Sequence, residues 1–202
     1  MEVKGPGETT FLKLVYRAPS GDDPDFFPFT LLDSLFSGPT SLSMFGGGGI
    51  SNKTSRLYRA LVERELAVSV SGSLQATIDP GTYDLQITVR PDKSVEAVIA
   101  AVDTEIKRLQ AEIFSEEEIA RAVKQARAMF AYSTENITNQ AFWLGFSEMF
   151  SSYEWFQRFV ANLEKVTPGE IQKAANLYLQ PSRRVVGVYL PTGESAEADE
   201  QA

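Results

Sequence analysis

The order of elements in this chain follows from residues 46–73, which read GGGGISNKTSRLYRALVERELAVSVSGS. The stretch begins with four consecutive glycines, and because glycine loses more backbone freedom on folding than any other residue, the run predicts an irregular loop. Apolar residues at helical spacing then predict a helix over 54–66. The next two apolar runs predict strands over 67–78 and 81–90, joined by an Asp-Pro-Gly turn into an antiparallel hairpin.

Similar patterns define the elements on either side of this stretch. Strands are expected over 9–18 and from Val185 to Leu190, and helices over 24–37, 94–113, 116–133, 137–150, 153–163 and 168–179. Two helices carry capping boxes, formed by Ser115 with Glu118 and by Thr167 with Glu170, and the first helix is expected to have Asp23 as its N-cap. A hairpin followed by a block of helices indicates an α+β fold, in which helices cover a mostly antiparallel sheet.

At 202 residues the chain has the length of one large domain, and a hydrophobic share of 43% is enough for a packed core. We expect a single domain over 1–191 and a disordered acidic tail over 192–202. No stretch has the roughly 18 uncharged apolar residues of a membrane-spanning helix, and the start, MEVKGPGETT, lacks the apolar run of a signal peptide. The sequence predicts a soluble domain without a membrane span and leaves its compartment open.

The composition excludes several classes of chemistry. The chain has 19 Lys and Arg against 27 Asp and Glu, a formal net charge of −8, and it has neither His nor Cys. It therefore lacks the usual ligands for a structural or His-ligated zinc, a haem or an iron–sulfur centre, and it cannot form a Ser-His-Asp or Cys-His nucleophile. Basic residues are scattered among acidic ones, which argues against binding nucleic acid. We expect no catalytic residue, no metal ligand and no cofactor in this chain.

The glycine run is the first candidate for a binding site. GGGGISNKT nearly matches the phosphate-binding pattern G-x-x-x-x-G-K-[ST], but Asn52 stands where the second glycine must let the backbone curl round a phosphate, and a helix rather than a strand is expected upstream. We prefer a flap whose amides bind extended peptide, with a loop that binds nothing as the alternative. The substrate-binding candidates are Gly46, Gly47, Gly48 and Gly49.

Two further groups of residues have simpler explanations. The acids Asp22, Asp23 and Asp25 lack the spacing of a calcium loop and fit turn and N-cap positions. The aromatic block that includes Trp143 and Trp155 fits a packed core, with a binding groove as the alternative.

Several motifs in order resemble the pitrilysin/insulinase metallopeptidase family, which includes mitochondrial processing peptidase. A glycine-rich loop is followed by Ser-Arg-Leu-Tyr and by Leu-Ala-Val-Ser-Val within residues 46–73. The other matching pieces are Tyr16-Arg17-Ala18, Ser115-x-x-Glu118-Ile119, and Val166-Thr167-Pro168-x-Glu170-Ile171 running into Ala174, Tyr178-Leu179 and Pro181. The resemblance spans roughly residues 9–191.

This resemblance implies a role for the chain. The family pairs two homologous domains across a chamber, and one of them carries the zinc motif His-x-x-Glu-His. A chain without His resembles the second, non-catalytic domain, which forms the other wall. In active members that domain supplies an Arg and a Tyr near the scissile bond, but the matching positions here hold Val62 and Val68. Arg59 and Arg64 lie close enough in sequence to be candidate substitutes.

The leading hypothesis is therefore a catalytically inactive domain that encloses peptide substrate against a zinc-bearing homologous domain or subunit. Zinc is expected only in that partner. A purely structural family member without a peptidase role is the main alternative, and an unrelated magnesium enzyme is a third. The isolated domain is also a candidate homodimer, and the sequence is compatible with an excised piece of a longer protein.

Overall fold

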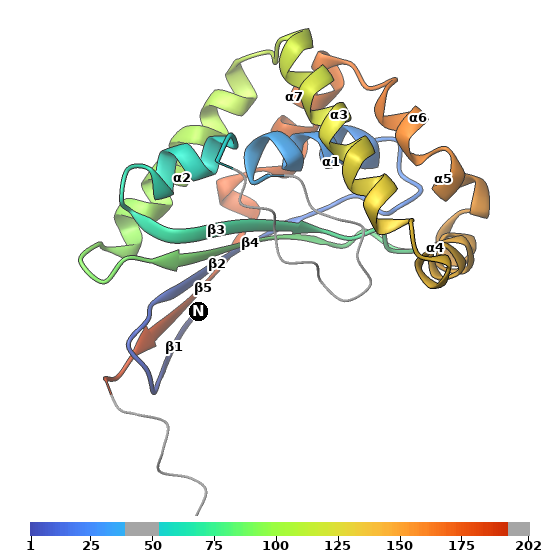
Figure 1. Cartoon of the computed structure of the whole chain (residues 1–202). Coiled ribbons are helices and arrows are strands. Elements are labelled where there is room, and N and C mark those ends of the chain that lie inside the picture. Colours follow the sequence, from blue (N-terminus) through green and yellow to red (C-terminus); the bar gives the residue numbers. More distant parts are fainter. Residues whose placement is uncertain (39–52, 194–202) are drawn as a thin grey trace, which may run out of the picture.

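The computed structural model describes residues 1–38 and 53–193 (Figure 1). Its centre is a five-stranded sheet in the order β1-β5-β2-β4-β3. The strands are β1 (Glu2–Gly5), β2 (Phe11–Arg17), β3 (Ala67–Leu74), β4 (Thr82–Val89) and β5 (Val185–Pro191). All neighbouring pairs are antiparallel except β1 with β5, which confirms the predicted α+β fold with a mostly antiparallel sheet.

The helices gather on one face of the sheet, above it in Figure 1. They are α1 (Phe26–Phe36), α2 (Val95–Ala111), α3 (Glu116–Ser133), α4 (Ile137–Phe150), α5 (Tyr153–Gln157), α6 (Phe159–Leu163) and α7 (Pro168–Tyr178), with a π-helix over Tyr58–Val62 and a 3-10 turn over Pro181–Arg183. None of the helices in the described part of the chain is long and apolar enough to cross a membrane.

The core lies between the sheet and this helical layer. Alternate residues of the two central strands are at most 2% exposed, because a strand points successive side chains to opposite faces. These residues are Leu12, Leu14 and Tyr16 of β2 and Tyr83, Leu85 and Ile87 of β4. Phe29 and Leu32 of α1 meet them from the helical side and are equally buried.

An ion pair in a half-buried position links the sheet to α2. Arg184, which precedes β5, donates both guanidinium nitrogens to Asp103 and also donates to the Tyr16 hydroxyl, at 3.1 Å. Burial alone lowers the pKa of the Arg184 guanidinium, but the bond to Asp103 outweighs it, so the pKa lies above its usual value. This network fixes the entry of β5 against the helical layer.

Most predicted boundaries agree with the structure, including both capping boxes. The predicted helix over 54–66 is wrong in length, because only a short π-helix forms there and Glu65 takes a left-handed φ of 57° that turns the chain into β3. The helix over 153–163 is two helices that meet at Arg158. Strand β1, in the polar lead, was not predicted.

The aspartates before α1 have the expected turn role in a different arrangement. Asp23 is not the N-cap, because α1 starts at Phe26, two residues after the expected start at residue 24. The N-cap residue is Asp25, and its side chain makes no cap hydrogen bond. Asp23 instead accepts a bond from the backbone N–H of Asp25, Asp22 accepts one from Ser151, and Asp25 pairs with Lys173 at 3.2 Å. Asp22 and Asp25 thus join the start of α1 to other helices, and Asp23 stabilises the turn itself.

Candidate functional site

The face of the sheet opposite the helices is the candidate site, and we call it the open face. No helix in the described part of the chain covers it (Figure 1). Strand register aligns its side chains in rows across the sheet. Across the sheet, the first row is Val3, Tyr189, Phe11, Thr88 and Ser69, the second is Gly187, Lys13, Gln86 and Ser71, and the third is Val185, Val15, Asp84 and Ser73. The first and third rows pass from apolar residues on the β5 and β2 side to polar residues on β4 and β3, and the second row places the charge of Lys13 on β2 between them.

The apolar half of the open face is in contact with solvent. Phe11 is 51% exposed and Val185 is 62% exposed, and the Phe11 ring packs against that of Tyr189 with centroids 6.2 Å apart. Large apolar side chains clustered on one exposed surface are typical of a protein interaction site.

The polar half centres on one ion pair. Lys13 Nζ lies 2.8 Å from Oδ2 of Asp84, while Oδ1 of Asp84 is buried and has no hydrogen-bond partner in the described structure. Two rows away from Asp84, the Ser69 hydroxyl donates to Thr88 at 2.9 Å. The hydroxyl groups are suited to bind polar groups of a ligand, whereas the unpaired Oδ1 of Asp84 is buried and not accessible from the surface. This set contains no nucleophile with a general base.

A buried polar cluster lies on the other side of the same two strands. The Asp33 carboxylate of α1 accepts hydrogen bonds from Ser37, at 2.5 Å, and from Tyr83, at 2.6 Å. Burial, and then the Asp33 charge, raises the pKa of the Tyr83 hydroxyl, so it stays protonated and donates. A Cβ at position 72 would overlap all three polar groups, which explains why Gly72 occupies the middle of β3.

The sequence-predicted site residues do not form a cluster in the described structure. The substrate-binding candidates Gly46, Gly47, Gly48 and Gly49 lie outside the described residues. Val62 is half-buried, and Val68 is exposed on β3.

Arg59 and Arg64 are exposed, and neither makes a salt bridge with another described residue. Their substitution for the family's Arg stays a prediction.

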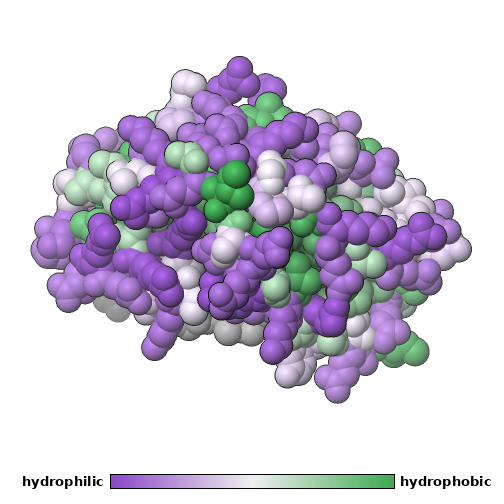
Figure 2. Space-filling model, turned by 90° about the horizontal axis from the view of Figure 1, so that it is seen from above, coloured by the Kyte–Doolittle hydropathy of each residue, from purple (hydrophilic) through white to green (hydrophobic). Residues whose placement is uncertain are grey.

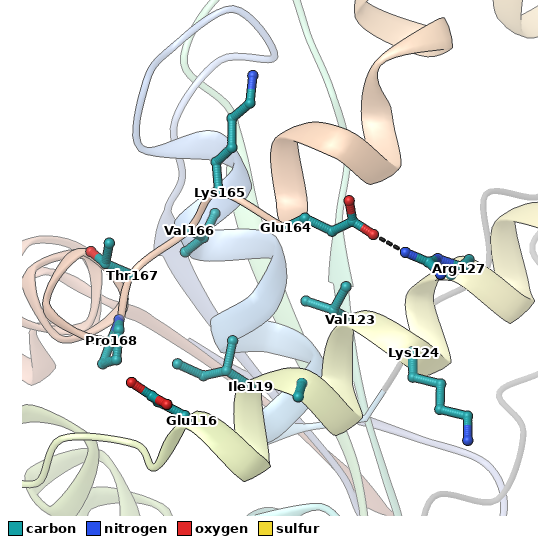
Figure 3. Close-up of a pocket in the computed structure, with 11 residues that line it drawn as sticks. Glu116, Ile119, Val123, Lys124, Arg127, Glu164, Lys165, Val166, Thr167 and Pro168 are labelled. Atoms are coloured by element: carbon teal, nitrogen blue, oxygen red, sulfur yellow. Dashed lines mark hydrogen bonds and ion pairs between the residues drawn. The ribbon is translucent and has the colours of Figure 1, made fainter.

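A separate pocket of about 670 Å³ lies in the helical layer, between α3 and the segment that joins α6 to α7 (Figure 3). Ile119, Val123 and Val166 supply its apolar lining, and the ion pair between Arg127 and Glu164 borders it. The α3 residues that line the pocket recur every three or four positions in the sequence. This spacing could not identify a pocket, because it is equally typical of a helix face packed in a core.

The donor set of this chain does not fit zinc. The sequence contains no His or Cys, and the described residues include no group of three or more acidic side chains that could hold a metal ion. The open face presents exposed apolar side chains and hydroxyl groups to solvent. Sequence reasoning missed this face because its rows combine residues from five separate strands.

Comparisons with known proteins agree with this geometry. A sequence profile of the family described as the peptidase M16 inactive domain matches residues 1–126. No curated protein sequence matches the chain significantly.

Three solved structures illustrate the shared fold. The inactive peptidase domain of a candidate zinc protease from Bordetella parapertussis superposes with a TM-score of 0.79, at 22% identity over 98% of each chain. A protease from Helicobacter pylori gives 0.80 at 14% identity, over 95% of this chain and 43% of that one. A chain of complex III2 from Candida albicans gives 0.71 at 12% identity, over 94% and 45%. This chain therefore spans a whole domain of the first protein and less than half of the other two.

Proposed function

Because this chain belongs to the peptidase M16 inactive domain family, we propose that it forms a non-catalytic wall of a peptide-binding chamber, completed by a zinc-bearing homologous domain or subunit. The observation that carries the proposal is the open face. A lone domain leaves Phe11 and Val185 in water, whereas a partner domain seated on β1, β5 and β2 would bury them.

The polar half of the open face would then border the space left between the two domains. Extended peptide offers backbone amides and carbonyls, which the Ser and Thr hydroxyls of β3 and β4 can bind. Hydrolysis would depend on zinc held by the partner, and this chain would bind and orient the substrate. Gly46, Gly47, Gly48 and Gly49 remain a proposed contact with peptide.

The test is co-expression with a homologous domain that carries His-x-x-Glu-His, followed by assays of complex formation and peptide cleavage. We expect addition of this chain to increase cleavage, and the double variant F11S/V185S to lose both binding and the increase. The matched control is Leu177→Ser, an exposed apolar residue on α7 of the helical layer. Stoichiometric zinc or peptide turnover by this chain alone would contradict the proposal.

A second candidate function is a structural subunit without a peptidase role, which the similarity to a chain of a respiratory complex favours. The same experiment separates the two functions. A structural subunit would bind its partner through the open face, and F11S/V185S would abolish binding, but cleavage would not change.

A direct substrate contact by Arg59 or Arg64 is tested in the same complex. If one of them substitutes for the absent family Arg, its replacement by Ala raises KM for the peptide while the partner still binds. If neither variant changes the kinetics, neither residue is the substitute.

A further inference from the structure

Three strands bring apolar side chains together in the first row of the open face. Val3 of β1 lies opposite Tyr189 of β5, and Tyr189 lies opposite Phe11 of β2. Val3 is 45% exposed and Phe11 is 51% exposed, whereas Tyr189 between them is half-buried. We call these three residues the aromatic cluster.

Gly5 makes the position of the Tyr189 ring possible. A glycine weakens a strand because it has no side chain to pack, and it often marks a site where another group approaches closely. A Cβ at this position would lie 2.5 Å from the Tyr189 hydroxyl oxygen and 3.0 Å from the ring carbon Cε2. The ring therefore occupies space beside the backbone of β1 that any other residue would fill with its own side chain.

The Tyr189 hydroxyl is held at the end of the same strand. It donates a hydrogen bond of 2.6 Å to the carbonyl of Pro6. The carbonyls before and after that of Pro6 accept hydrogen bonds from the backbone amides of Thr192 and Gly193, at 2.8 and 3.1 Å. The acceptor is thus part of a fixed stretch of backbone, and the Tyr189 side chain is held both by β5 and through its hydroxyl.

An aromatic side chain held in this way is suited to anchor a protein partner. Tyrosine is enriched among the few residues that carry most of the binding energy of an interface. A side chain that is fixed before binding also loses less conformational freedom when a partner covers it. The hydroxyl oxygen donates its hydrogen to Pro6 and can still accept a hydrogen bond from the partner.

The aromatic cluster differs from the isolated apolar residues on the rest of the surface. The helical side of the molecule, seen from above, is mostly hydrophilic with hydrophobic side chains in small groups (Figure 2). Single exposed apolar residues of this kind are normal on any protein surface. In the aromatic cluster, by contrast, two exposed apolar residues flank a ring that a glycine and a hydrogen bond hold in place.

We propose that Tyr189 is an anchor residue of the interface through which the open face binds the zinc-bearing homologous domain, and that Gly5 is a positioning residue that acts through the Tyr189 ring. This inference rests on the proposed function and adds which side chain the partner covers and what orients it. The partner surface opposite the aromatic cluster is expected to be apolar, with a hydrogen-bond donor facing the Tyr189 hydroxyl.

The first test measures binding of the full chain to the homologous domain with His-x-x-Glu-His by isothermal titration calorimetry. Tyr189→Ala should raise the dissociation constant about thirtyfold or more, as for an interface anchor. Gly5→Ala should raise it about tenfold, because the ring must move, and Tyr189→Phe about threefold, because only the hydroxyl is lost. The matched control is Gly145→Ala on α4, where a Cβ meets no atom within 4 Å, and it should leave the constant unchanged.

The second test distinguishes a positioning role from a merely structural one. If Gly5 acts through the ring, Gly5→Ala changes the affinity little once Tyr189 is alanine, so the effects of the two substitutions are not additive. Thermal unfolding of the free variants, followed by circular dichroism, supplies the second readout. Gly5→Ala should change the melting temperature little, because the half-buried ring can move aside, whereas a structural role would lower it.

Two results would overturn the inference. They are an unchanged affinity of Tyr189→Ala or Gly5→Ala, and additive effects of these two substitutions. If F11S/V185S loses binding in the same assay while Tyr189→Ala does not, the proposed function stands and the role of Tyr189 alone is refuted. If the unmodified chain does not bind the homologous domain, both are refuted.

Discussion

The two faces of the sheet are built from the same strands but have opposite chemistry. On β4, Leu85 points into the core and is fully buried, while its neighbour Gln86 points to the open face and is exposed. The covered face is mostly apolar apart from the buried cluster at Asp33, whereas the open face carries exposed apolar, polar and charged side chains. We infer that the covered face determines the stability of the fold and that the open face is left available for binding.

The most direct way to test this contrast is to truncate neighbouring residues on β4. Leu85→Ala should lower the free energy of unfolding by about 3 kcal/mol, because it removes buried methyl groups and leaves a cavity. Gln86→Ala should change it by no more than about 0.5 kcal/mol. Chemical denaturation followed by circular dichroism measures both. Equal losses would show that the open face contributes to stability as much as the core does.

A second pair of variants compares the two faces on β3. Gly72→Ala forces a Cβ into the space of the Asp33, Ser37 and Tyr83 polar groups and should cost about 2 kcal/mol through displaced buried hydrogen bonds. Ser71→Ala, the adjacent open-face residue, is the control and should be close to neutral. If Gly72→Ala unfolds at the same denaturant concentration as the unmodified chain, the polar cluster is not rigid.

The helical layer also depends on its caps, which gives a pH-dependent prediction. Hydrogen bonds from the Thr167 backbone N–H and then from its hydroxyl lower the pKa of Glu170 below its usual 4.5. Because the folded pKa is the lower one, the cap stabilises the protein fully above pH 4.5, and this stabilisation is lost as the pH falls through the folded pKa.

Glu170→Gln should therefore reduce stability by about 0.5–1 kcal/mol at neutral pH and progressively less in acid. Urea unfolding curves over a pH series measure the difference between the two chains. A difference that stays constant down to low pH would exclude the carboxylate charge as its source.

The smallest expected effect concerns the ion pair on the open face. Lys13→Met removes the partner of Asp84 and should cost about 0.5–1 kcal/mol, an effect that decreases at high salt because half of the Lys13 side chain is exposed. The matched control is Lys4→Met, since Lys4 lies 4.0 Å from Glu2 and both side chains are mostly exposed. If Lys13→Met and Lys4→Met change the free energy of unfolding equally, the ion pair of Lys13 with Asp84 stabilises the fold no more than an exposed surface pair does.

Local patterns in the sequence predicted most of the fold. Alternation on β2, apolar spacing on α2 and the Ser115 and Thr167 capping boxes each depend on residues a few positions apart, and the structure confirms them. β1 escaped prediction because its four residues, EVKG, form a strand only by pairing with β5 at the other end of the chain.

The candidate site could be predicted less well than the fold. The absence of His and Cys and the family resemblance identified an inactive domain, which the family match supports. The open face and the cluster at Gly72 could not be found, because their members meet only through strand register and through α1. The predicted contact of Gly46–Gly49 with peptide stays a prediction.

The pairing of β1 with β5 has a mechanical consequence. The two strands run parallel, and the amino group of Met1 donates to the carbonyl of Val186. Tension that pulls the start of β1 and the end of β5 in opposite directions would load their hydrogen bonds in shear, so that the bonds resist together instead of separating one after another. We therefore expect the outer pair of strands to resist unfolding when force is applied to the start of β1 and the end of β5.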